Sequence, residues 1–217
     1  MKKFLFVFYV IFSVSSNFST HAIDLPKYYK FPKNYLKGKF YDSSKDFFLV
    51  STKKTGDLRF INTVIIILEH DKDGALGIVI NKPLGKFKLG DLISNTKDKK
   101  INKKELYDVN IPIYWGGPLD NDKILILHSN DYKNNTTKIF KQISISKGYK
   151  TLIDIAEKKG PKDNIVILGV AAWNANQLDG EIEMEKWTIS EINTDLIFNT
   201  DNNSKWSKAF KNSFIRL

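Results

Sequence analysis

The sequence predicts a single α/β or α+β domain. Short runs rich in Val, Ile and Phe recur along the chain, which is typical of β-strands. An amphipathic helical pattern lies between two of these runs, and neither an internal repeat nor a clear linker divides the 217 residues. A chain of this length is sufficient for one large domain around one hydrophobic core.

The expected strands share a high content of β-branched and aromatic residues. They cover residues 47–52, 63–68, 76–80, 111–115, 123–128, 139–145 and 164–170. The runs TVIIIL and NIVILGV are continuous rather than alternating. We therefore expect both to be buried on two faces of a sheet.

The clearest helix lies in KGYKTLIDIAEKKGP, whose apolar residues recur at helical spacing, at Tyr149, Leu152, Ile153 and Ala156. The following Gly160 and Pro161 predict its end. Further helices are expected near 175–183 and 203–211. The stretch SNTKDKKINKK, 94–104, is typical of a charged loop.

The stretch HDKDGALGIVINKPLG, residues 70–85, could hold a phosphate, hold a metal or simply turn the chain. Its glycines do not have the spacing of either phosphate-binding loop. A calcium loop would need later ligands and a closing glutamate, which are missing. We therefore predict a hairpin in which strands 63–68 and 76–81 pair antiparallel through a turn at 71–74. A metal site using His70, His128 and a carboxylate is the remaining alternative.

The N-terminus resembles a secretory signal peptide. A basic Met-Lys-Lys start is followed by an uncharged apolar run over 4–13 and a small-residue exit ending at Ala22. We expect residues 1–22 to be a signal peptide, 23–45 an extended lead-in, and the folded domain to cover 46–217. An uncleaved anchor is the alternative, although the run is short for a membrane span.

Composition limits the chemistry. The chain has no cysteine, which excludes disulfides, a thiol nucleophile and thiolate metal sites. Its net charge is +10, but Arg59 and Arg216 are its only arginines. Because arginine supplies the bidentate contacts that read guanine, we expect no specific DNA binding. We also expect no cofactor and no transmembrane span after signal cleavage.

Four ordered motifs resemble those of the bacterial AlgH/YqgE family. EHDKDGALGIVINKPLG resembles its EH…GAMGLVINKP segment, and three more matches follow in YWGGPLD with LILHS, in GPKDNIVILGVAAWNANQLDGEIEMEKW and in DLIFNT. The resemblance covers about residues 46–210 and implies an α/β fold with a bifurcated, barrel-like sheet flanked by helices. Members are often labelled transcriptional regulators, but no agreed catalytic residues can be carried over. This chain departs from the pattern in its signal-like start and in Ala172 and Asn174, where glycines are usual.

Polar and aromatic residues at the expected strand ends are the candidate ligand or partner surface: His70, Asn81, Lys82, Trp115, Gly116, Gly117, His128, Trp173, Gln177 and Glu181. If the strands are parallel neighbours, their carboxyl ends share one edge. We then expect a groove with Lys82 as the anion contact and Trp173 as the apolar wall. The alternative is that each residue serves its own turn or helix cap.

Nothing in the sequence selects a catalytic group, because no G-x-S-x-G elbow raises one serine above the others. The sequence favours a non-enzymatic binding or interaction protein in the periplasm, whose partner is an unknown small ligand or protein. A cytoplasmic transcriptional regulator linked to nucleic acid is the alternative if the N-terminus is not a working signal. An uncharacterised hydrolase is the second alternative.

Overall fold

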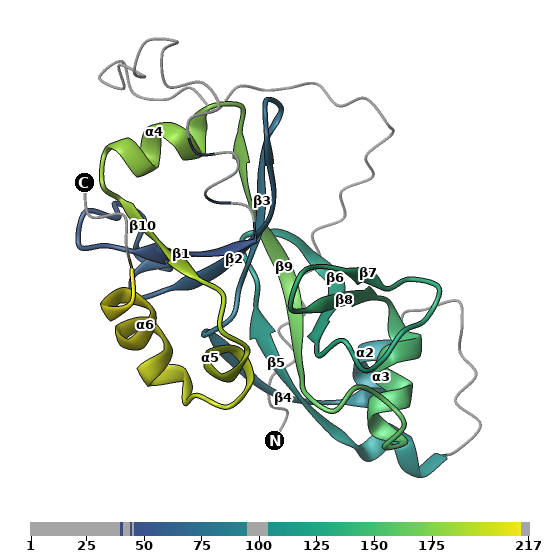
Figure 1. The fold of residues 1–217 in the computed structure, drawn as a ribbon. Helices are drawn as coiled ribbons and strands as arrows, with labels where there is room; N and C mark the ends of the chain where they lie inside the picture. Colours follow the sequence, from purple (N-terminus) through teal and green to yellow (C-terminus); the bar gives the residue numbers. More distant parts are fainter. Residues whose placement is uncertain (1–39, 41–43, 45, 95–103, 214–217) are drawn as a thin grey trace, which may run out of the picture. The chain divides into compact units, whose positions relative to one another are not determined.

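The strand β9 (Asn164–Asn174) is the centre of the sheet in the computed structural model, which describes Phe40, Ser44 and residues 46–94 and 104–213 (Figure 1). It pairs antiparallel with β3 (Gly74–Val79) at one end and with β6 (Leu119–His128) over most of its length. It also pairs parallel with β5 (Asn110–Trp115). The sheet therefore divides at β9 into two halves.

Both halves are built mainly from antiparallel pairs. On one side of β9 the order continues from β3 through β2 (Val64–Asp71) and β1 (Phe47–Ser51) to β10 (Trp187–Glu191). On the other side it continues from β6 through β8 (Ser144–Lys147) to β7 (Lys138–Ile139). The strand β4 (Pro83–Lys88) pairs with β5 alone.

The side-chain alternation of β9 changes at Gly169. Before it, Ile165 and Ile167 contribute to one core cluster, whereas after it the even-numbered Val170 packs against the same cluster. Gly169 has a φ of +82°, a left-handed conformation that glycine adopts at little cost. This irregularity redirects the faces of β9 where its pairing passes from one half of the sheet to the other.

Three core clusters fill the faces of the sheet. The first lies against α5 (Thr194–Phe198) and α6 (Asn202–Lys211). The second includes residues of α4 (Gln177–Glu183) and Phe60 from η2 (Leu58–Phe60). The third involves α2 (Leu89–Ile93), η3 (Lys104–Asp108) and α3 (Tyr149–Ala156). Figure 1 shows α2 and α3 together beside β6 and β8, away from α5 and α6.

The structure confirms the α/β fold with a divided, curled sheet. The predicted hairpin is present, with β2 and β3 antiparallel and joined at Asp71 and Gly74. The run from Val64 to Ile67 is fully buried, as its continuous hydrophobicity predicts. The expected helices are also present as α3, α4 and α6.

Four sequence-based predictions need correction. The single strand expected at 139–145 is instead β7 and β8, because Phe140 N donates to Ile143 O at 2.8 Å and closes a turn. The sequence predicted no strand between 76–81 and 111–115, but β4 begins at Pro83 and continues to Lys88. Among the strand ends proposed to share an edge, only β5 is parallel to β9. The end of the lead-in is also packed, because Phe40 is buried in the second cluster.

Some predictions lie outside the described residues. These are the signal peptide, most of the lead-in and most of the loop expected at 94–104. Within the described part of the chain, no helix has the length and apolar character needed to cross a membrane.

Replacing Gly74 with Val is expected to lower the free energy of unfolding by about 1–3 kcal/mol. Gly74 has a φ of +141°, and a Cβ there would lie 2.3 Å from the Trp173 carbonyl oxygen of β9. Urea denaturation of the two proteins measures the difference. Gly56→Val is the matched control, since a Cβ at Gly56 meets nothing within 4 Å. Equal losses for both variants would contradict the role of this close approach.

Candidate functional site

Lys82 and Trp115 are neighbours, as the groove hypothesis requires. The Trp115 backbone N donates to Lys82 O at 2.8 Å. Both residues line an open pocket of about 430 Å³, together with Arg59, Pro83, Leu84, Pro118 and Asn121. The Lys82 ammonium is already used, because it donates to Ile61 O at 2.8 Å.

Trp173 does not line that pocket. A row of packed rings connects it to Trp115 instead, through Phe60 and Trp187. The ring centroids are 5.4 Å apart for Trp115 and Phe60, 5.7 Å for Phe60 and Trp187, and 6.1 Å for Trp187 and Trp173. The rings of Phe60 and Trp187 therefore fill the space between Trp115 and Trp173, the two tryptophans of the candidate surface.

Gln177 and Glu181 meet Trp173, but they make structural bonds. Glu181 Oε2 accepts from Trp173 Nε1 at 2.9 Å and from Trp187 Nε1 at 2.7 Å. Gln177 Nε2 donates to the other carboxylate oxygen at 3.1 Å. One carboxylate thus fixes two indoles against α4. The sequence did not indicate that Trp187 is the second indole bound by Glu181, because Trp187 lies on β10 and Trp173 on β9.

Gly116 and Gly117 allow β5 and β9 to approach closely. A Cβ on Gly116 would lie 2.2 Å from Gly169 O, and one on Gly117 would lie 2.1 Å from the Val170 carbonyl carbon. The Gly116 amide donates to Leu168 O at 2.7 Å. These two glycines therefore serve the packing of the strands.

His70 joins a buried serine and a buried aspartate. The Ser44 hydroxyl lies 2.5 Å from His70 Nδ1, and Asp179 Oδ2 lies 3.5 Å from Nε2. Asp179 Oδ1 accepts from the Phe40 amide at 3.2 Å. Burial lowers the pKa of His70, although the nearby Asp179 charge opposes that shift. The order Ser-His-Asp resembles a hydrolytic relay, but Ser44 is only 1% exposed.

His128 and Asn81 are also bonded inside the protein. His128 is fully buried, with Nε2 2.9 Å from Ser146 Oγ and Nδ1 2.7 Å from Ser129 O. It pairs with Asn164, at the opposite end of β9 from Trp173. Asn81 Oδ1 accepts from Val64 N at 2.9 Å. Among the described residues no group of three His, Cys, Asp or Glu side chains is placed to hold a metal ion.

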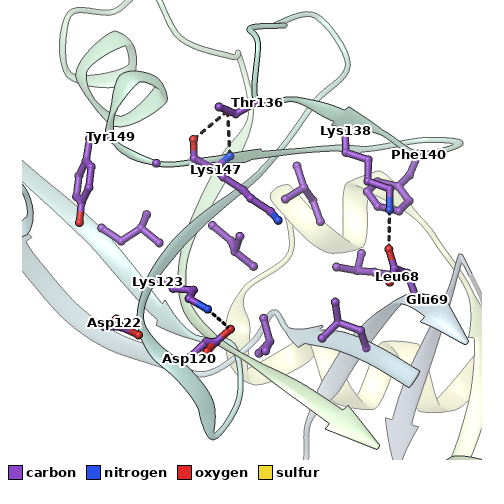
Figure 2. Close-up of a pocket in the computed structure, with 16 residues that line it drawn as sticks. Leu68, Glu69, Asp120, Asp122, Lys123, Thr136, Lys138, Phe140, Lys147 and Tyr149 are labelled. Carbon is purple, nitrogen blue, oxygen red and sulfur yellow. Dashed lines mark hydrogen bonds and ion pairs between the residues drawn. The ribbon is translucent and has the colours of Figure 1, made fainter. Parts of the chain in front are cut away.

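A different cavity lies between the two halves of the sheet. This crevice has a volume of about 430 Å³ and is lined by residues of β2, β3, β6, β9 and the segment 136–149 (Figure 2). Its apolar lining comes from Leu68, Leu76, Ile124, Leu125, Phe140, Ile145 and Val170. A second hollow shares Leu68, Glu69, Lys138 and Phe140 with it and continues to Asp71 and Lys141. The crevice therefore combines an apolar lining with a charged rim.

Two ion pairs border the crevice. Lys138 Nζ lies 2.6 Å from Glu69 Oε1 and joins β7 to β2. Lys123 Nζ lies 2.8 Å from Asp120 Oδ2 within β6. Figure 2 shows both pairs at the border, with the Lys147 side chain extending between them into the pocket.

Sequence reasoning missed the crevice because its walls meet only in three dimensions. Irregular pairing interrupts β2 between Ile67 and Glu69, and β6 between Leu119 and Ile124. Such bulges redirect side chains and often occur beside functional sites. The polar run DNDK within an otherwise apolar strand is the one local signal that could have indicated this rim.

The divided sheet and the four ordered motifs define a class of bacterial α/β proteins. Comparison with known proteins identifies the family. The chain belongs to the AlgH-like family, whose model matches residues 48–217. A UPF0301 protein of Marinomonas sp. (strain MWYL1) is 35% identical over 173 residues, 78% of this chain and 89% of that protein. A UPF0301 protein of Rickettsia africae (strain ESF-5) is 37% identical over 150 residues, 69% of this chain and 77% of that protein.

Solved structures agree with this assignment. The solution structure of the AlgH protein from Pseudomonas aeruginosa matches with a TM-score of 0.66 and 26% identity, covering 83% of this chain and 90% of that chain. The protein DIP2367 from Corynebacterium diphtheriae matches with a TM-score of 0.58 and 16% identity, covering 80% and 88%. The second likeness concerns the fold alone. The function of this family is unsettled.

A buried lysine, Lys205, lines neither the crevice nor the pocket beside Lys82 and Trp115. Lys205 of α6 is 2% exposed. Its Nζ is 3.4 Å from Ile80 O and 5.8 Å from the centroid of the Tyr114 ring. Burial lowers the pKa of Lys205 from 10.5 to about 8, while Asp201 acts in the opposite direction.

Lys205 is expected to make stability depend on alkaline pH. Between pH 8 and 10.5 the unfolded chain binds the proton that the folded chain has lost. The Lys205 contribution to the free energy of unfolding therefore rises through this window, by up to about 3 kcal/mol. Urea denaturation of the wild type and Lys205→Met at pH 7 and pH 10 measures it as a difference, which cancels other titrating groups. Parallel pH dependences would contradict the shifted pKa.

Proposed function

We propose that this protein is a non-enzymatic binding protein that takes a small amphipathic ligand in the crevice between the two halves of its sheet. The observation that carries this proposal is the crevice lining, in which buried aliphatic residues such as Leu68 and Ile145 lie beneath a charged rim. Small-ligand sites commonly combine mostly apolar walls with a few placed polar groups, and volumes of about 300–1,000 Å³ are usual. The crevice meets both criteria.

The crevice is preferred over the pocket beside Lys82 and Trp115. In that pocket Lys82 is bonded to Ile61 O and Arg59 is paired with Asp57 at 2.6 Å. A ligand would have to replace these bonds to use either charge. We retain that pocket as a second contact surface for a ligand or partner.

The proposal of a non-enzymatic role rests on how the reactive groups are used. His70 and His128 are buried and hydrogen-bonded, and Glu181 holds two indoles. A hydrolase using Ser44, His70 and Asp179 would need a route for substrate to reach a serine that is 1% exposed. The geometry therefore favours binding over hydrolysis.

We also propose that the protein acts in the periplasm after removal of residues 1–22. Support comes from the basic start, the apolar run and the small-residue exit of this segment. The family match begins at residue 48, after the segment. An exported protein would not act on chromosomal DNA, and the scarcity of arginine supports the same conclusion. The cytoplasmic regulator is the alternative.

Binding in the crevice is tested with the uncharged dye N-phenyl-1-naphthylamine, whose fluorescence rises in apolar surroundings. The wild type is expected to bind the dye, and Leu76→Trp to weaken binding about ten-fold or more, because the indole occupies space that Leu76 borders. Leu58→Trp is the control, since Leu58 is 79% exposed and outside the crevice. Equal binding by the two variants, both shown to be folded by circular dichroism, would place the dye elsewhere and contradict the proposal.

Export is tested by expressing the full chain in a Gram-negative host. The mature protein is expected to begin at Ile23 and to be released with the periplasmic fraction. Intact-mass measurement and fractionation are the readouts, and Ala22→Arg is the matched variant because signal cleavage needs a small residue. A wild-type product that keeps its N-terminal segment and remains in the cytoplasm would exclude export and restore the regulator hypothesis.

A further inference from the structure

The rim of the crevice contains a lysine that neither bordering ion pair involves. Three lysines and three acids line the crevice: Lys123, Lys138, Lys147, Glu69, Asp120 and Asp122. Two of the lysines are paired, Lys138 with Glu69 at 2.6 Å and Lys123 with Asp120 at 2.8 Å. Among the described residues the Lys147 ammonium forms no ion pair. We propose that Lys147 binds the anionic head group of an amphiphile whose apolar body occupies the crevice, an inference that rests on the proposed binding function.

The backbone of Lys147 is held on both sides. Its N–H donates to Thr136 Oγ1 at 3.2 Å, and its carbonyl accepts from the same hydroxyl at 2.9 Å. Lys147 also pairs with Leu125 of β6. Figure 2 shows the side chain directed from this fixed point into the middle of the pocket. The backbone of β8 thereby fixes the point from which the Lys147 side chain extends into the crevice.

The surface beneath the ammonium is apolar. Leu125 and Ile145 are 8% and 5% exposed and belong to the first core cluster, and Val170 packs against it from β9. A hydrocarbon chain on this surface would remove apolar area from water. One lysine outside the two ion pairs, next to this apolar surface, suits a ligand with an acid group at one end.

The amino end of α3, which follows Lys147 in the chain, also favours an anionic head group. Gly148 and Tyr149 line the crevice, and α3 begins at Tyr149 with neither a capping side chain nor an acid in its first turn. The amino end of a helix carries partial positive charge, which adds to that of Lys147. Asp122 acts in the opposite direction, since its carboxylate also borders the crevice. A cationic head group is therefore the competing choice.

The test compares three ligands that share a ten-carbon chain: decanoate, decanol and decyltrimethylammonium. Each displaces N-phenyl-1-naphthylamine from the full-length protein at low salt. Decanoate is expected to bind about five-fold more tightly than decanol, a difference typical of one partly exposed ion pair. The preference should fall as salt is added, because mobile ions screen such a pair.

Lys147→Gln is expected to weaken decanoate binding about five-fold, so that this variant no longer distinguishes decanoate from decanol. Lys133→Gln is the matched control, an exposed lysine outside the crevice, and should keep the decanoate preference. Equal affinities of the wild type for decanoate and decanol, or tighter binding of the cationic ligand, would overturn the anion inference while leaving the binding function intact. Failure of the dye and all three ligands to bind would overturn both.

Discussion

The direct contact between Gly116–Gly117 and β9 is the constraint on which the rest of the structure depends. A Cβ on either glycine would enter the backbone of Gly169 or Val170, so any side chain there would force the strands apart. Gly116 also bonds to β9 and accepts from β3 at Val79. The two halves of the sheet therefore meet where backbone packs against backbone.

The crevice is a consequence of this junction. At Gly169 the side-chain alternation of β9 changes. The regular pairing of β2 is interrupted between Ile67 and Glu69, and that of β6 between Leu119 and Ile124. The strands on either side of β9 consequently leave apolar side chains around an open space rather than closing on one another. The Glu69–Lys138 ion pair, 2.6 Å long, links the two halves across it. A preformed space with apolar walls suits the binding role that we propose.

The polar residues that look most reactive in the sequence serve largely to hold parts of the fold together. Glu181 fixes two indoles, His70 connects Ser44 to Asp179, and Asn81 bonds to the start of β2. Buried polar groups need such partners because desolvation without them is costly. The lysine that we propose as the ligand contact, Lys147, lies instead on the crevice rim, at the end of a strand that carries no distinctive motif.

Local sequence patterns by themselves were sufficient to predict two strands, one hairpin and one helix. The continuous hydrophobic runs predict β2 and β9, the turn residues at 71–74 predict the β2–β3 hairpin, and helical spacing predicts α3. The motifs also indicated the family. Only the tertiary structure decided that β9 pairs antiparallel with β3 and β6, that Trp187 joins Trp173 on one carboxylate, and that 136–149 faces β2 and β3 across the crevice. These contacts join residues far apart in the chain, and their partners are set by packing and backbone hydrogen bonds, which local composition does not encode.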